Sequence, residues 1–196
     1  IDPRPYGLFV NAPSLAYLME QCQSLKILSF KNLEIDEDQC RVLGAFSRPD
    51  LEIVLDRSAI TSTGTSALAE VLGRNQGPTK LEYCKIDNFV LANGLRGNSR
   101  LKSLRLRFST NPEVGNREIL AIADALKENK GLVNLDLCHD FTISDETLNT
   151  VCDSLKTHPT LEVLTLPYKW PYRGAPVAPA VLKPLIETVV DMLKVN

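Results

Sequence analysis

The chain has few of the residues on which catalytic and metal sites depend. Its 196 residues include 2 histidines, 1 tryptophan and 5 cysteines, and no Cys-x-x-Cys pair occurs. This pattern provides no zinc-ligand spacing. Cys138, His139 and Asp140 are the residue types of a catalytic triad, but adjacent side chains on an extended segment point to opposite faces. We therefore expect no enzymatic activity, no metal and no cofactor.

The chain also lacks long apolar runs, an even set of cysteines and a strong charge of either sign. No stretch approaches the roughly 20 apolar residues that cross a bilayer. The net charge of −2 argues against nucleic acid or a membrane surface as the main partner. An odd number of cysteines at irregular spacing favours free thiols, and no Asn-x-Ser/Thr sequon occurs. These features predict an intracellular, cytoplasmic protein. The chain begins at Ile1, so the N-terminus itself gives no information on localisation.

What the chain does contain is one pattern that recurs along its length. A helix-like run, a turn and an alternating apolar run follow one another in ALKENKGLVNLDL (125–137), and SLKTHPTLEVLTL (154–166) repeats the order. The turn has a fixed spacing, found at Leu95, Asn98 and Leu101, at Leu126, Asn129 and Leu132, and at Leu155, His158 and Leu161. A chain that repeats one strand and one helix in this way stacks its units side by side to bury a shared core.

Alternation over four or five residues predicts a short strand that is buried on one face. We place the strand centres at Leu28, Ile53, Cys84, Leu104, Leu135 and Leu164, and expect one parallel sheet paired in chain order. The 20-residue step from Cys84 to Leu104 leaves 88–99 too short for a full helix, so we expect a 3₁₀ turn or loop there. Asn129 suits a left-handed helix cap. Cys84 and Cys152 should be buried and unlinked, with Cys138 the most accessible strand cysteine.

The runs RLKSLRL, GLVNLDL and TLEVLTL resemble the L-x-x-L-x-L signature of leucine-rich repeats. The segments TGTSALAEVLGRN and SDETLNTVCDSLKTHP are similar to the helical halves of the ribonuclease-inhibitor-like subfamily. The resemblance implies an α/β leucine-rich repeat solenoid, curved, with a parallel sheet on the concave face and helices on the convex face. It further implies a single domain over 1–196 with about six repeat units, taken from a longer array. The family's usual Asn after each strand is here Ser109, Asp140 or Lys169, so we expect ragged turns.

On such a fold the strand side chains that are not buried form the concave surface. We expect one lateral row of Lys85, Arg105 and Asp136 and a second of Asp56, Asp87 and Arg107. Tyr83, Arg105 and Arg107 are the candidate anchors because Tyr and Arg dominate interface hot spots. The aromatic residues Tyr168 and Trp170 form a further candidate contact. An equally weighted interpretation is that these charges only pair with one another.

The sequence therefore predicts a protein–protein interaction module that binds its partner through the concave face. Five cations and no acidic residue lie between Asp87 and Glu113, so a partner with an acidic patch would fit. Nucleic acid is an unlikely partner, and no small-molecule substrate is expected. The alternatives are a regulator of a small GTPase or other enzyme, with Arg57 or Arg107 presented to the nucleotide site, and a structural scaffold segment without a specific ligand.

Overall fold

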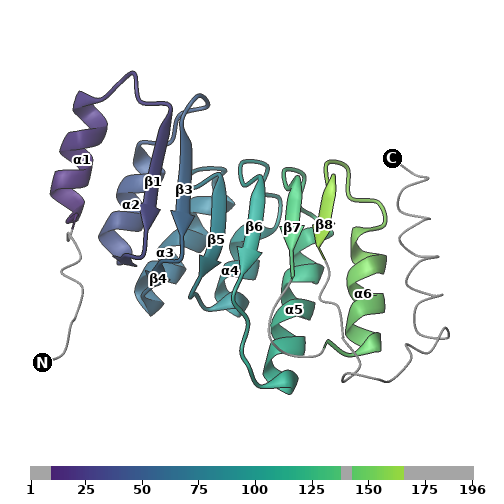
Figure 1. Ribbon diagram of the computed structural model, residues 1–196. Coiled ribbons are helices and arrows are strands. Elements are labelled where there is room, and N and C mark those ends of the chain that lie inside the picture. Colours follow the sequence, from purple (N-terminus) through teal and green to yellow (C-terminus); the bar gives the residue numbers. More distant parts are fainter. Residues whose placement is uncertain (1–9, 138–142, 166–196) are drawn as a thin grey trace, which may run out of the picture.

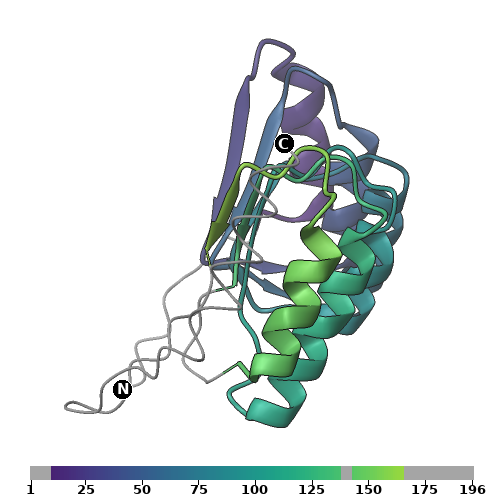
Figure 2. The same cartoon turned by 90° about the vertical axis from the view of Figure 1, so that its right-hand side faces the viewer.

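The computed structural model describes residues 10–137 and 143–165. These residues form two layers, a parallel sheet and a row of helices that covers one of its faces (Figures 1 and 2). The sheet strands are β1 (Ile27–Lys31), β3 (Glu52–Asp56), β5 (Lys80–Cys84), β6 (Ser103–Leu106), β7 (Asn134–Asp136) and β8 (Val163–Thr165). The helices are α1 (Ala12–Gln21), α2 (Glu37–Ala45), α3 (Ser62–Gly73), α4 (Asn88–Leu95), α5 (Pro112–Leu126) and α6 (Asp145–Leu155).

Strands and helices alternate along the chain. The six strands are hydrogen-bonded in chain order, and every neighbouring pair is parallel. A second, two-stranded parallel pair joins β2 (Glu34–Ile35) to β4 (Ala59–Ile60). The predicted continuous sheet is therefore confirmed. Within the described residues, no helix has the length and apolar character needed to cross a bilayer.

The core is a leucine-rich layer between the sheet and the helices. Neighbouring strands place Leu55, Leu81, Leu104 and Leu135 in register, and each is at most 1% exposed. Leu68 and Leu72 of α3 are fully buried on the helical side of the layer. An isolated strand and helix would leave these side chains in water, so stacking against the next unit provides the burial that holds the sheet together.

The predicted centres Leu28 and Ile53 pair with each other, but they do not lie in the row of the later centres. Leu55 and Leu81, rather than Ile53 and Cys84, lie in the row of Leu104. The register shifts between Glu82 and Cys84, where Tyr83 adopts a left-handed φ of 55°. One strand thus carries an extra residue opposite its neighbour, which is a β-bulge, and simple alternation does not predict it.

The segment predicted to be a turn or loop contains the helix α4, so that expectation is corrected. The Asp87 side chain caps the helix and accepts hydrogen bonds from the backbone N–H groups of Phe89 and Val90, at 3.0 and 3.2 Å. Gly94 lets the helix lie close to its neighbour, because a Cβ there would come within 2.5 Å of the Ala69 carbonyl oxygen. With Leu81 as the strand centre, the connection to Leu104 is also longer than the one predicted from Cys84.

The buried side chain of Asn129 ties two neighbouring units together. Its amide Nδ2 donates to the carbonyl oxygen of Leu95 at 2.9 Å. Its Oδ1 accepts from the backbone N–H groups of Gly131 and Leu132, at 2.9 and 3.0 Å. Asn129 does not have a positive φ, so the predicted left-handed cap is wrong. Its polar groups bond to the turn before the next strand and to the last residue of α4, the helix of the preceding unit.

The same tie is made one unit earlier and is incomplete one unit later. Asn98 donates to the Leu72 carbonyl at 2.6 Å and accepts from the backbone N–H of Leu101 at 2.9 Å. At the third position, Nδ1 of His158 accepts from the Thr160 N–H at 3.4 Å, while its buried Nε2 has no hydrogen-bond partner among the described residues. The asparagine ties that we expected to be missing after the strands are therefore provided at the helix ends.

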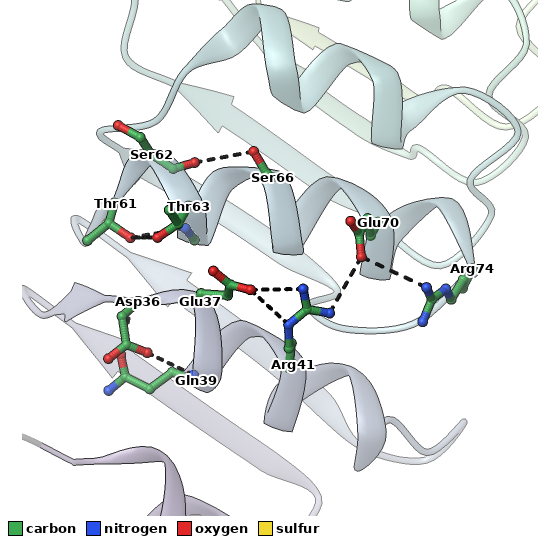
Figure 3. Close-up of polar contacts among 11 residues, drawn as sticks. Asp36, Glu37, Gln39, Arg41, Thr61, Ser62, Thr63, Ser66, Glu70 and Arg74 are labelled. Carbon is green, nitrogen blue, oxygen red and sulfur yellow. Dashed lines mark hydrogen bonds and ion pairs between the residues drawn. The ribbon is translucent and has the colours of Figure 1, made fainter.

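Ion pairs connect neighbouring helices on the outer surface (Figure 3). Arg41 lies between Glu37 of its own helix, at 2.9 Å, and Glu70 of the next helix, at 3.5 Å. Glu70 also contacts Arg74 at 3.9 Å. Asp36 and Gln39 form a capping box at the start of α2. These pairs are solvent-exposed, and each contributes little to stability.

The cysteines of the described residues are free. Cys40, Cys84 and Cys152 are buried and Cys22 is exposed. The prediction that Cys84 and Cys152 are buried, unlinked thiols is confirmed. Burial, assisted by nearby carboxylates, raises the pKa of the Cys40 thiol to about 12, and burial raises that of Cys84 to about 11. Cys138, predicted to be the most accessible, lies outside the described residues.

Candidate partner-binding face

The face of the sheet that the helices leave uncovered carries a lateral row of charged side chains. We call this face the strand face, and its central row consists of Lys31, Asp56, Glu82, Arg105 and Asp136. The row contains Glu82 where the sequence predicted Lys85, because Glu82 pairs with Arg105 and Cys84 lies level with Leu106. The pairing of Arg105 with Asp136 in neighbouring strands is as predicted.

Arg105 and Asp136 form a close ion pair. Nε of Arg105 lies 2.6 Å from Oδ2 of Asp136, whose side chain is 8% exposed. Burial lowers the pKa of the Arg105 guanidinium, but the charges of Asp136 and Glu82 and the hydrogen bond that Arg105 donates to Asp136 raise it above the ordinary value. Arg105 therefore stays charged and is held in one position, with one side of its guanidinium directed at Asp136.

Tyr83 lies over this guanidinium. The ring centroid is 5.0 Å from Cζ of Arg105 and 6.0 Å from Cζ of Arg57. Both distances fall within the range of a cation–π contact, which contributes about 0.5–1 kcal/mol at an exposed site. The left-handed backbone of Tyr83 is unfavourable for a residue with a Cβ by roughly 1–2 kcal/mol. The ring contacts thus offset the cost of a strained backbone and do not exceed it by much.

The strain is notable because other residues would relieve it. Glycine, and to a lesser degree asparagine, adopt positive φ with little penalty. The equivalent turn positions after β1 and β3 are Asn32 and Arg57, both also at positive φ. β-Bulges often occur beside functional sites, where they redirect a side chain. Here the bulge places an aromatic ring in the middle of the strand face, partly exposed and flanked by two cations.

The other predicted cations flank this centre but do not join the row. Lys85 follows the strand, where its backbone pairs with Ala59, and its side chain is exposed. Arg107 is exposed beyond the end of β6, and its carbonyl accepts a hydrogen bond from Nδ2 of Asn88 at 3.0 Å. Within the described residues, neither the Lys85 nor the Arg107 side chain forms an ion pair. Both charges are available to an acidic partner.

The predicted second row of charges does not exist. Asp87 caps α4, and Asp56 contacts Lys31 at 3.7 Å and Arg57 at 3.9 Å. The strand pairing sets Arg107 in register with neither carboxylate. The prediction of this row was wrong because residues were counted from Cys84, which pairs with Leu106 and not with Leu104.

The five cations between Asp87 and Glu113 do not lie together. Arg96 lies at the end of α4 and pairs with Glu128 at 2.7 Å and with Asp124 of α5. Arg100 and Lys102 lie in the loop before β6 and bond to backbone carbonyls. Tyr168 and Trp170 lie outside the described residues.

Two residues of the site were not recognised as members of it from the sequence. Glu82 was missed because the alternation assigned Tyr83 and Lys85 to its face. Arg57 was considered only for the enzyme-regulating alternative, whereas here it contacts the Tyr83 ring. The described residues hold no cluster of three or more His, Cys, Asp or Glu side chains in the arrangement of a metal site.

Comparison with known proteins assigns the chain to no family. The sequence matches no protein-family model, and a search of curated proteins finds no match.

Proposed function

We propose that this chain is a leucine-rich repeat solenoid that binds a partner protein through its strand face. Three features support the solenoid. Strand and helix alternate, the strands pair in chain order, and Asn98 and Asn129 make the same tie between successive units. Such an array presents a continuous surface of strand side chains, which is where proteins of this kind offer room to a ligand.

One observation carries the functional proposal, namely Tyr83 in a strained conformation above the fixed guanidinium of Arg105. The equivalent position after β1 is Asn32, which tolerates this φ, whereas Arg57 and Tyr83 accept the strain and their side chains meet in the ring contact. Tyrosine and arginine are enriched in interface hot spots. Tyrosine buries a large area with few rotatable bonds, and arginine forms several directed hydrogen bonds. The ring is also held in place before any partner arrives, which lowers the entropic cost of binding.

The charges around this centre define the chemistry of the partner. Asp56, Glu82 and Asp136 lie in the row with Lys31 and Arg105, so the middle of the face is mixed in sign. The cations Lys85 and Arg107 flank it without ion pairs within the described residues. A partner surface with acidic groups around an apolar or aromatic contact complements this pattern.

Affinity capture with variants of the strand face tests the proposal. A specific partner should bind the wild type and bind Tyr83→Ala at least about 30-fold more weakly, since a hot-spot truncation costs about 2 kcal/mol or more. Arg107→Ala should reduce binding less. Lys127→Ala, at the end of α5 on the helical side, should leave it unchanged.

A partner that ignores Tyr83 and responds to Lys127 would contradict the proposal. The alternative function as a regulator of a GTPase has its own outcome. Stimulated GTP hydrolysis that is lost on Arg57→Ala or Arg107→Ala would favour it over simple binding.

A further inference from the structure

A groove opens at the edge of the sheet where the strands β1, β3, β5 and β6 begin. We call it the edge groove; its volume is about 520 Å³. Its charged lining residues are Lys26, Asp50, Glu52, Lys80, Arg100 and Lys102. Four cations thus face two carboxylates, and the groove has an excess of positive charge.

Both carboxylates are already paired. Nζ of Lys26 lies 2.8 Å from Oδ2 of Asp50, and Nζ of Lys80 lies 2.8 Å from Oε1 of Glu52. These two pairs are close to neutral in sum. The excess charge therefore belongs to Arg100 and Lys102.

Arg100 is held by three backbone carbonyls. Its Nε donates to Gly77 at 2.8 Å, its Nη1 to Arg48 at 3.0 Å and its Nη2 to Leu51 at 3.0 Å. A guanidinium has five N–H donors, so these bonds leave two of them unused. Burial lowers the pKa of Arg100. Within the described residues, its charge is compensated by carbonyl dipoles and by no carboxylate.

Lys102 is fixed in a similar way. Its Nζ donates to the carbonyl oxygens of Ser99 at 2.8 Å and Gly131 at 3.2 Å. One of its three ammonium hydrogens remains. Two cations of the edge groove are thus held in position by neutral groups before any ligand binds. An incoming carboxylate would form charge-assisted hydrogen bonds without breaking an ion pair.

We propose that the edge groove binds acidic side chains of a peptide segment of the partner protein. The groove spans the beginnings of four strands, which suits an extended chain better than a single small anion. The apolar side chain of Ile27, which is 60% exposed, and Pro49 provide a wall against which peptide carbon atoms can pack. This inference deepens the proposed function and rests on it for one point, that the ligand is a protein.

The test uses a short fluorescent Glu-rich peptide and the change in its fluorescence anisotropy on binding. We expect saturable binding that weakens as salt is added. Lys102→Met should lower the affinity roughly tenfold, the loss of one charge-assisted hydrogen bond. The matched control is Lys127→Met, which removes the same charge from a side chain that contacts Asp124 on the helical side at 3.2 Å. It should leave the affinity unchanged.

Arg100→Lys provides a second variant that keeps the charge but loses the planar fork. It should weaken peptide binding while circular dichroism confirms that the protein is folded. If Arg100→Lys unfolds the protein, Lys102→Met alone decides the result, because the exposed Lys102 side chain bonds only to carbonyls in the described part of the chain.

Three results would overturn the inference. The first is the absence of saturable peptide binding. The second is an equal loss of peptide affinity with Lys127→Met, which would show a response to net charge only. The third is displacement of the peptide by inorganic phosphate at the same concentration as the peptide. A loss with Tyr83→Ala but not with Lys102→Met would place the peptide on the strand face. That outcome removes the edge groove from the account and leaves the proposed function standing. Conversely, suppose that peptide affinity depends on Lys102 while the affinity of a protein partner is unchanged by Tyr83→Ala. This result would contradict the strand-face function and leave the edge groove standing.

Discussion

Replacing Asn129 by alanine tests how the repeating units are joined. The residue is 1% exposed and its side chain makes three hydrogen bonds, one to the end of α4 in the preceding unit and two to the turn before the next strand. Alanine removes all three and leaves buried backbone groups without partners. The turn is also packed closely against the preceding unit, because a Cβ at Gly131 would come within 2.3 Å of the Ser99 backbone.

The expected loss follows from these bonds. A typical hydrogen bond contributes about 1 kcal/mol net, and an unsatisfied buried partner adds to the loss. We therefore expect Asn129→Ala to lower the free energy of unfolding by about 3 kcal/mol. That is a large part of the roughly 5–15 kcal/mol typical of a domain.

Urea unfolding followed by circular dichroism measures this change. The midpoint should fall while the slope m stays constant, since the surface exposed on unfolding is the same. Asn116→Ala is the matched control. That half-buried side chain bonds to Pro112 and Ser144 in hydrogen bonds that water can replace, so the cost should be below about 1 kcal/mol. A loss of less than about 1 kcal/mol for Asn129→Ala would refute the tie between units.

Three further predictions concern a histidine, the thiols and the central ion pair. His158→Asn should stabilise the protein by about 1 kcal/mol in the same urea assay, because an amide can complete the tie that Nε2 leaves open. Burial lowers the pKa of His158 in the folded state, so as the pH falls the unfolded state takes up this proton first. The free energy of unfolding of the wild type should therefore decrease as the pH drops below about 6.5, and His158→Asn should not show this decrease. A thiol reagent should label Cys22 quickly and Cys84 only on unfolding, and rapid labelling of Cys84 would contradict the register of β5. A double-mutant cycle of Arg105→Ala and Asp136→Ala should give a coupling of about 1 kcal/mol or more, and a value near zero would show that the pair is not formed in solution.

The parallel sheet and its chain order could be predicted because they depend on local patterns. Alternating leucines specify which face of each strand is buried, and the recurring turn specifies where the next strand begins. Leu104, Leu135 and Leu164 lie in one row, as expected. In this half of the sheet each strand keeps the simple alternation, so counting residues was enough.

The site could be predicted only in part because one residue departs from that alternation. Cys84 pairs with Leu106 and not with Leu104, an offset of two residues, and the bulge at Tyr83 adds one more before it, so Glu82 and not Lys85 lies beside Arg105. No composition or spacing rule predicts positive φ at a tyrosine. The role of Asn129 was missed for a similar reason. Its partner, the Leu95 carbonyl, is 34 residues away, and a contact at that distance is absent from local sequence patterns.

The most direct test of the central claim is to measure both stability and partner binding for Tyr83→Asn. Asparagine tolerates the left-handed φ of this position, so relief of backbone strain should balance the lost ring contacts and keep the free energy of unfolding within about 1 kcal/mol of wild type. Partner affinity should nevertheless fall at least about 30-fold. A folded variant that binds its partner as tightly as wild type would contradict the claim that Tyr83 is held above Arg105 for recognition.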